Sequence, residues 1–257
     1  MDQKVVPRHG LWRRAGCMAA LGLVGVFSLL LQPLPEALMR QHPELAEMPP
    51  WLLQLAVVLN PLILLLAAAL SGTLLAHRVG LRSVLAGTAS AGDMRRAWPL
   101  AAGVGLATGA LAVLLDIAAA PVLGDAWSRF LWQASRPDLP ALLVGVLYGG
   151  ITEEILLRWG VMSALAWALW SIGGKKRMGF WMWAAIVATA LIFGAAHLPA
   201  LAAQVELTTG IVVRTVLINA LAAVVYGWVC WRHHLEAAML SHASSHLAMA
   251  TAWALLG

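Results

Sequence analysis

The sequence predicts an all-α fold, a polytopic membrane helix bundle of about seven transmembrane helices. Three observations lead to this prediction. Of the 257 residues, 61% are hydrophobic and 11% are charged, whereas soluble domains carry about 25% charged residues. The mean hydropathy of +0.81 indicates more apolar surface than a water-soluble core buries. The apolar residues also form runs of about 20 residues, the length that spans a bilayer.

Seven apolar segments reach this length. Their predicted ranges are 15–33, 51–76, 98–121, 139–172, 180–199, 210–231 and 235–256. We expect the first to be an uncleaved helix rather than a signal peptide, because its apolar run is long and no clear small-residue cleavage site follows. Segments one to three with their loops make up an N-terminal region, 1–138, and segments four to seven a C-terminal region, 139–257.

The basic residues are distributed unevenly between the loops. Twelve Lys and Arg residues precede the first segment or lie in every second connection after it, against three in the alternate connections. The positive-inside rule then places the N-terminus in the cytoplasm and the C-terminus outside. An aromatic belt near the segment ends supports this layout: Trp12, Trp51, Trp98, Trp127, Trp132, Trp181 and Trp231.

The net charge of +5 follows from this topology signal, so we expect no nucleic-acid partner. We expect a multi-pass protein of the cell membrane, surrounded by membrane lipid. The Ala-, Leu- and Trp-rich composition is typical of a bacterial chain, which favours the bacterial inner membrane.

The fourth segment carries charge where a membrane helix should have none, at Glu153, Glu154 and Arg158. An ionised side chain at the bilayer centre costs about 2.5–3.5 kcal/mol on insertion scales, so such residues are candidates for a functional site. The segment is also long, since about 34 helical residues reach about 50 Å. It must tilt, break near Gly149-Gly150 or project from the membrane.

The three charged residues predict two different roles for the carboxylates. Glu154 and Arg158 are four residues apart, so they share a helix face and can form an ion pair. Glu153 points about 100° away from Glu154 on an α-helix. It therefore stays free to accept a proton as a general base. The alternative is a purely structural buried ion network.

The fifth segment carries Phe193 and His197 four residues apart. His197 lies 22 residues after Lys175 in the connecting turn, and Glu153 lies 22 residues before it. In two antiparallel helices these residues reach the same depth, which predicts that they face one site. The alternative for His197 is a hydrogen-bonded packing residue.

The last segment carries His242 and His246, which share a helix face. This spacing suits a divalent metal ion. It also suits two hydrogen-bond donors directed at a developing oxyanion. Elsewhere, we expect Asp116 and Arg214 to form a structural pair, because both lie near the outer ends of their segments.

Three motifs follow one another along the chain: Glu-Glu-x-x-x-Arg at 153–158, Phe-x-x-x-His at 193–197 and His-Ala at 242–243. In this order, in a polytopic protein, they resemble the CPBP family. This is the CAAX prenyl-protease and bacteriocin-processing group, also called Abi. The likeness covers about 145–250, while the residues before about 140 match only as generic membrane segments.

The resemblance implies an intramembrane endopeptidase. By analogy, Glu153 activates the attacking water, and Glu154 and His197 help to place and polarise it. His242 and His246 stabilise the tetrahedral oxyanion. His246 is a departure, because the family usually has Asn at this position.

The departure leaves two chemistries open. A glutamate-activated water without a cofactor is the favoured one. The alternative is a zinc site of His197, His242, His246 and Glu153, since three histidines and a glutamate suffice for zinc. Family members have been described as both types.

The substrate is expected to be a membrane-associated or lipidated protein or peptide. A bacteriocin leader, a lipopeptide or the terminal sorting helix of a membrane protein fits a bacterial chain better than a prenylated protein. We expect the cavity to open toward the cytoplasm, because His242 lies in the cytoplasmic half of its segment. Two other functions remain alternatives, a non-catalytic immunity or scaffold protein of the same architecture and a proton-coupled transporter.

Overall fold

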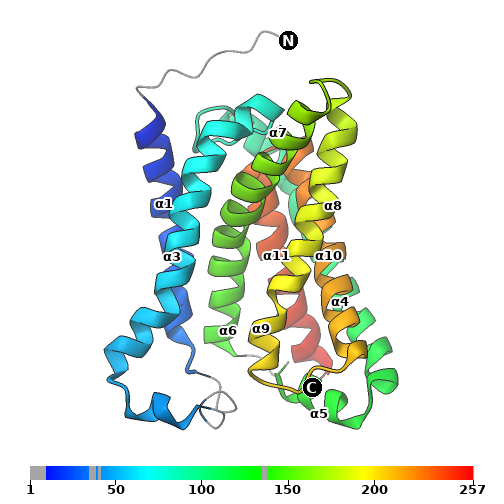
Figure 1. Ribbon diagram of the computed structural model, residues 1–257. Coiled ribbons are helices and arrows are strands. Elements are labelled where there is room, and N and C mark those ends of the chain that lie inside the picture. The colour runs from blue at the N-terminus through cyan, green and yellow to red at the C-terminus, as the bar shows by residue number, and fades with distance from the viewer. Residues whose placement is uncertain (1–9, 35–38, 40–41, 135–137, 257) are drawn as a thin grey trace.

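A computed structural model describes residues 10–34, 39, 42–134 and 138–256 (Figure 1). Throughout these residues the chain is helical or in turns, without a β-strand. The helices are α1 (Leu11–Ser28), α3 (Pro50–Leu75), α4 (Ala91–Leu123), α5 (Asp125–Ala134), α6 (Leu139–Val144), α7 (Ser163–Ile172), α8 (Met178–Ala196), α9 (Leu198–Ala202), α10 (Thr209–Arg232) and α11 (Leu235–Leu256). The predicted all-α membrane bundle is confirmed.

Six helical runs in the described ranges are long and apolar enough to cross a membrane: Leu11–Leu31, Pro50–Val79, Ala91–Leu123, Leu139–Ile172, Met178–Ala202 and Thr209–Arg232. They correspond to the first six predicted segments. The seventh segment is a helix too, α11, but its His and Ser residues make it less apolar. It packs against α4, α10 and the fourth segment, so its polar side chains face protein rather than lipid: Ser241, His242, Ser244 and Ser245.

The fourth segment is helical from α6 to α7 without the break near Gly149-Gly150 that was one of the expected alternatives. Between these α-helices the backbone forms two π-helical stretches, Gly145–Glu153 and Ile155–Met162. A π-helix is wider than an α-helix and frequently marks a functional site. The charged motif lies within this widened part of the helix.

Small residues bring the helices of the site close together. A Cβ added at Gly105 or Gly109 of α4 would overlap the backbone carbonyl of Ser241 or Ser245 on α11. A Cβ at Gly150 would approach the Cβ of Ala243 to 2.8 Å. In lipid the hydrophobic effect does not drive helices together. Close contacts at small residues stabilise the helix pairs instead, because they allow close van der Waals packing. They hold α11 between α4 and the fourth segment.

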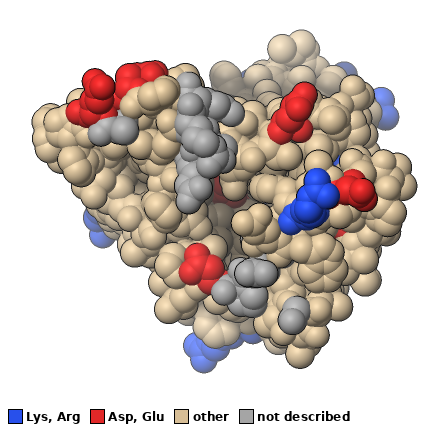
Figure 2. All heavy atoms as spheres, turned by 90° about the horizontal axis from the view of Figure 1, so that it is seen from below, with Lys and Arg blue, Asp and Glu red and all other residues tan. Residues whose placement is uncertain are grey.

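The bundle has two unlike ends, which we call the basic face and the opposite face. The basic face is at the top of Figure 1, where α1 and α11 begin and the turn from α7 to α8 lies. Its described Lys and Arg residues are Arg13, Arg14, Arg78, Arg82, Arg95, Arg96, Lys175, Lys176, Arg177 and Arg232. The opposite face holds α5, α9 and the end of α11, and there acidic side chains outnumber basic ones (Figure 2).

Candidate active site

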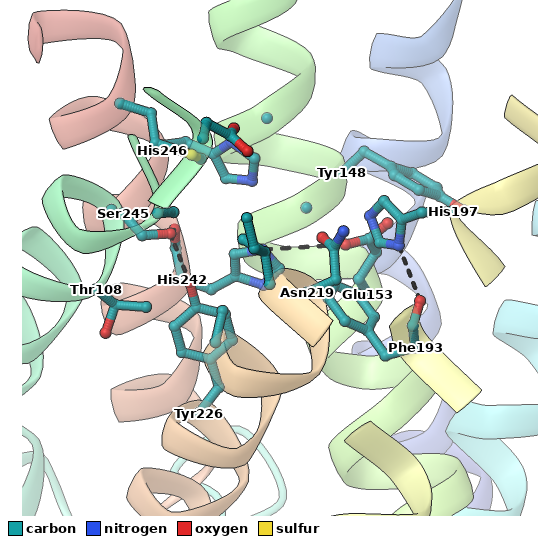
Figure 3. Close-up of a pocket in the computed structure, with 18 of the residues that line it drawn as sticks. Thr108, Tyr148, Glu153, Phe193, His197, Asn219, Tyr226, His242, Ser245 and His246 are labelled. Atoms are coloured by element: carbon teal, nitrogen blue, oxygen red, sulfur yellow. Dashed lines mark hydrogen bonds and ion pairs between the residues drawn. The ribbon is translucent and has the colours of Figure 1, made fainter. Parts of the chain in front are cut away.

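A cavity of about 290 Å³ lies inside the bundle, between α4, the fourth segment, α8, α10 and α11. Polar side chains from all five elements converge on it (Figure 3). Its polar and aromatic lining is Thr108, Asp116, Tyr148, Glu153, Phe193, His197, Arg214, Asn219, Tyr226, His242, Ser245 and His246. Four of the predicted site residues therefore line one cavity: Glu153, His197, His242 and His246.

The two adjacent glutamates occupy different environments. Glu153 lines the cavity, and its side chain is 17% exposed. Glu154 is fully buried behind it, with Oε2 3.2 Å from Nε of Arg158. Arg158 is also buried and donates from Nη2 to the carbonyl of Ala223 at 3.1 Å. The predicted pairing of Glu154 with Arg158, and the separation of Glu153 from it, are both present.

Arg158 and Glu154 form the base of the site. The guanidinium carbon of Arg158 lies 5.2 Å from the ring centre of Phe193 and 5.6 Å from that of Tyr226. Both rings line the cavity. Cation–π contacts of this kind stabilise an arginine that has been removed from water. The buried cation compensates the Glu154 carboxylate, whereas the Glu153 carboxylate lies on the cavity side, 4.0 Å from Nε2 of His242.

His242 is held by contacts on three sides. Its Nδ1 lies 2.9 Å from Oε1 of Glu154. Its ring stacks on Tyr226, with centroids 4.4 Å apart and planes at 18°. The Tyr226 hydroxyl donates to Oγ of Ser245 at 2.6 Å, and that hydroxyl donates to the carbonyl of His242 at 2.7 Å. The contacts with Glu154 and Tyr226 fix the imidazole itself, with Nε2 4.0 Å from Oε2 of Glu153, whereas the Ser245 bond holds the backbone.

His197 lies directly after the last residue of α8. Its Nδ1 is 2.8 Å from the carbonyl oxygen of Phe193, so Nδ1 carries the hydrogen and Nε2 is free. The Phe193 ring contacts His197 edge-on at 4.6 Å and His242 at 5.9 Å between centroids. Phe193 thus lies beside both imidazoles.

His246 packs over the glycines of the π-helical stretch. A Cβ added at Gly145 or Gly149 would lie 2.6 Å from a ring nitrogen of His246. The His246 ring also stacks on His242, with centroids 5.1 Å apart and planes at 18°. Gly149 therefore allows a close helix approach and makes room for the imidazole of His246.

The histidine set does not converge as a zinc site requires. Within the described residues, no group of three or more His, Cys, Asp or Glu side chains is arranged to hold a metal ion. The lone pairs of an imidazole lie in the ring plane, and the His242 and His246 planes are nearly parallel. Nδ1 of His242 and Nδ1 of His197 bind Glu154 and the Phe193 carbonyl, contacts that also orient imidazoles in metal sites, so the ring stacking and not these contacts counts against zinc. This donor set as placed does not fit zinc.

Several lining residues were not among the predicted site residues. Tyr226, Ser245, Asn219 and Tyr148 all line the cavity. Asn219 could have been found from the sequence, because an amide within an apolar segment needs a polar partner or a cavity. The same holds for Ser245, whereas its hydrogen bond with Tyr226 depends on the packing of α10 against α11 and could not be found from the sequence.

Asp116 and Arg214 form the predicted pair, with Nε of Arg214 2.6 Å from Oδ1 of Asp116. The pair connects α4 with α10, and both side chains also line the cavity. The guanidinium also lies 5.0 Å from the ring centre of Trp127 on α5. This end of the cavity therefore carries a fixed cation and a fixed anion.

Residues 135–248 match the family model described as "Rce1-like: Type II CAAX prenyl endopeptidase Rce1-like". The expected resemblance to the CPBP family is therefore confirmed. The match contains every predicted site residue, from Glu153 to His246. No curated protein and no solved structure matches the chain. The CPBP family is one of membrane proteases, so the match supports an intramembrane endopeptidase, in keeping with the helices that are able to cross a membrane.

Proposed function

We propose that this chain, which resembles the CPBP family, is an intramembrane endopeptidase in which Glu153 activates water against a peptide bond. One observation carries the proposal. The Glu153 carboxylate faces the fixed imidazole of His242 across a polar cavity inside an apolar bundle. The 4.0 Å between Oε2 of Glu153 and Nε2 of His242 is too long for a direct hydrogen bond, so this carboxylate is not committed to the imidazole and can take a proton from a water molecule.

In this mechanism Glu153 takes a proton from the water while the water oxygen attacks the carbonyl carbon of the scissile bond. Negative charge then develops on the carbonyl oxygen. His242, held at Nδ1 by Glu154, donates from Nε2 to that oxyanion. His246 supplies a second donor, and Nε2 of His197 helps to orient the water. Glu153 finally gives its proton to the leaving amine nitrogen as the carbon–nitrogen bond breaks.

The substrate must expose its backbone inside the cavity. A helical peptide hides its carbonyl groups in its own hydrogen bonds, so an extended or unwound segment is required. We propose a membrane-associated or lipidated protein or peptide as substrate, in a bacterial inner membrane. The pairing of a free and a compensated glutamate favours water activation without a cofactor over zinc.

The test uses the full-length protein purified in detergent and a panel of quenched fluorescent peptides, prenylated ones included. Cleavage is compared for wild type, Glu153→Gln and Glu206→Gln, with and without a metal chelator. Glu206→Gln is the matched control, because Glu206 is an exposed residue outside the cavity. We expect loss of cleavage only in Glu153→Gln, by about 10²–10⁴-fold, the usual contribution of a general base.

Two results would count against this chemistry. Loss of cleavage on chelation with rescue by zinc would replace it with a metalloprotease. Unchanged cleavage in Glu153→Gln would remove Glu153 as the base. Absence of cleavage by wild type across the panel, combined with an unchanged cellular phenotype for Glu153→Gln, would favour the scaffold alternative, and pH-dependent uptake into liposomes would favour a transporter.

A further inference from the structure

The cavity lies toward one end of the bundle. On α4, on the fourth segment and on α8, every lining residue falls in the half of the helix nearest the opposite face. Examples are Asp116 near the end of α4, Gly145 near the start of the fourth segment and His197 just after α8. The middle parts of α10 and α11 complete the wall. Figure 2 shows the opposite face hollowed at its centre.

The half of the bundle nearest the basic face is packed with apolar side chains. Fully buried residues fill the space between the catalytic motif and that face: Ala76, Val79, Ala97, Ala101, Trp159, Met162, Ala166, Met182, Ile186, Val229 and Leu235. The buried Glu154–Arg158 pair lies at the boundary between this core and the cavity. A dense core of this kind passes neither water nor a peptide chain.

Access from the basic face is therefore closed, which differs from the expected cytoplasmic opening. The sequence argument placed His242 in the cytoplasmic half of its helix, and α11 does begin at the basic face. However, the cavity continues from His242 along α11 to Met249, away from that face. The depth of one residue did not determine the direction in which the cavity extends.

The charges assign the two faces to the two sides of the membrane. Among the described residues, ten Lys and Arg side chains lie at the basic face. At the opposite face the described part of the chain has one, Arg129 on α5. Five described carboxylates lie at the opposite face: Glu44, Glu47, Asp125, Asp138 and Glu206. The positive-inside rule makes the basic face cytoplasmic.

We propose that the site is reached from the extracytoplasmic side of the membrane. The substrate class is then a polypeptide segment presented at the outer leaflet, such as an exported peptide or the outward terminus of a membrane protein. The Asp116–Arg214 pair and Asn219 provide polar groups along the path from this side. The direction of access is inferred only from the position of the cavity and the distribution of charged residues between the two faces. The substrate class also rests on the proposed endopeptidase function.

Single-cysteine accessibility tests the proposal in the intact protein. The background is Cys17→Ser with Cys230→Ala, expressed in a bacterial inner membrane. Met249→Cys reports on the cavity, Lys176→Cys on the basic face and Gln133→Cys on the opposite face, where Gln133 of α5 is exposed. A small charged methanethiosulfonate is added to spheroplasts and, separately, to inverted vesicles, because a fixed charge crosses the hydrocarbon core poorly.

We expect Met249→Cys and Gln133→Cys to react about tenfold faster in spheroplasts, and Lys176→Cys about tenfold faster in inverted vesicles, since the reagent must cross the bilayer to reach the other side. Met249→Cys reacting like Lys176→Cys would overturn the direction of access. Lys176→Cys reacting from outside would overturn the assignment of the faces.

A membrane-impermeant peptide substrate separates this proposal from the proposed function. Cleavage in spheroplasts but not by sealed inverted vesicles supports both, and the reverse pattern overturns the substrate class. If the cysteines react as expected and neither preparation cleaves any peptide, the access route is supported and the endopeptidase function is what fails.

Discussion

Nδ1 of His242 lies 2.9 Å from Oε1 of Glu154, although 88 residues separate the two in the chain. This contact ties α11 to the charged motif of the fourth segment. It also divides the work of the two adjacent glutamates, because Glu154 is committed to His242 and Arg158 while Glu153 faces the cavity. An orienting carboxylate behind an imidazole fixes its tautomer and supports its positive charge.

The contact predicts the effect of changing His242. His242→Gln keeps an amide that can donate to Glu154 but loses Nε2, the atom that faces Glu153. If the Nε2–H donor stabilises the oxyanion, we expect kcat to fall by about 10²–10³-fold with little change in KM, as for other oxyanion donors. The measurement is steady-state cleavage of the best peptide. A change in KM alone would instead assign His242 to substrate binding.

Replacement of Arg158 should lower the free energy of unfolding of the protein. Arg158→Met leaves the Glu154 carboxylate buried without its cation, and breaking a buried pair costs about 3–5 kcal/mol. Arg96→Met is the control, because Arg96 pairs with Asp93 at an exposed position, where a pair contributes about 0–1 kcal/mol. Unfolding in detergent, followed by circular dichroism, compares the two. Equal losses of stability would contradict the structural role of Arg158.

Tyr226 should affect the site through His242. Tyr226→Phe removes the hydroxyl that donates to Ser245 and thus loosens the loop of hydrogen bonds that reaches the His242 carbonyl. We expect a loss of about 1 kcal/mol of stability, with a fall in kcat. In a double-mutant cycle with Ser245→Ala the two effects should be non-additive, since both residues act in one network. Additive effects on kcat would show that they act separately.

Substitution of Gly149, which lies against the His246 ring, should lower the rate of peptide cleavage. Gly149→Ala puts a methyl group 2.6 Å from Nε2 of His246, so the imidazole must move. Misplacement of about 1 Å at a reacting centre costs up to about 10²-fold in rate. Gly103→Ala on α4 is the control, because nothing lies within 4 Å of its added Cβ. We measure peptide cleavage for both variants.

A double variant distinguishes displacement of His246 from a general distortion of the fourth segment. When His246→Ala has already removed the ring, adding Gly149→Ala should lower cleavage little further. An undiminished effect of Gly149→Ala in that background would mean that the glycine acts through the backbone and not through His246.

The sequence by itself determined the class of fold, the first six membrane segments and the charge asymmetry of the loops. These properties are local, because a run of about 20 apolar residues forms a membrane helix whatever lies beside it. The pairing of Glu154 with Arg158 was predictable for the same reason, since helical spacing alone brings the two together. The motif order also sufficed for the resemblance to the CPBP family, which the match over 135–248 confirms.

Only the tertiary structure decided which side chains meet and where the cavity leads. The hydrogen bonds from Tyr226 to Ser245 and from His242 to Glu154 join helices whose rotation about their axes is set by packing against several neighbours. The parallel stacking of His242 on His246, which argues against the zinc set, depends on the same packing. The direction of the cavity follows from which half of the bundle the large apolar side chains fill, and that is a property of all the helices together.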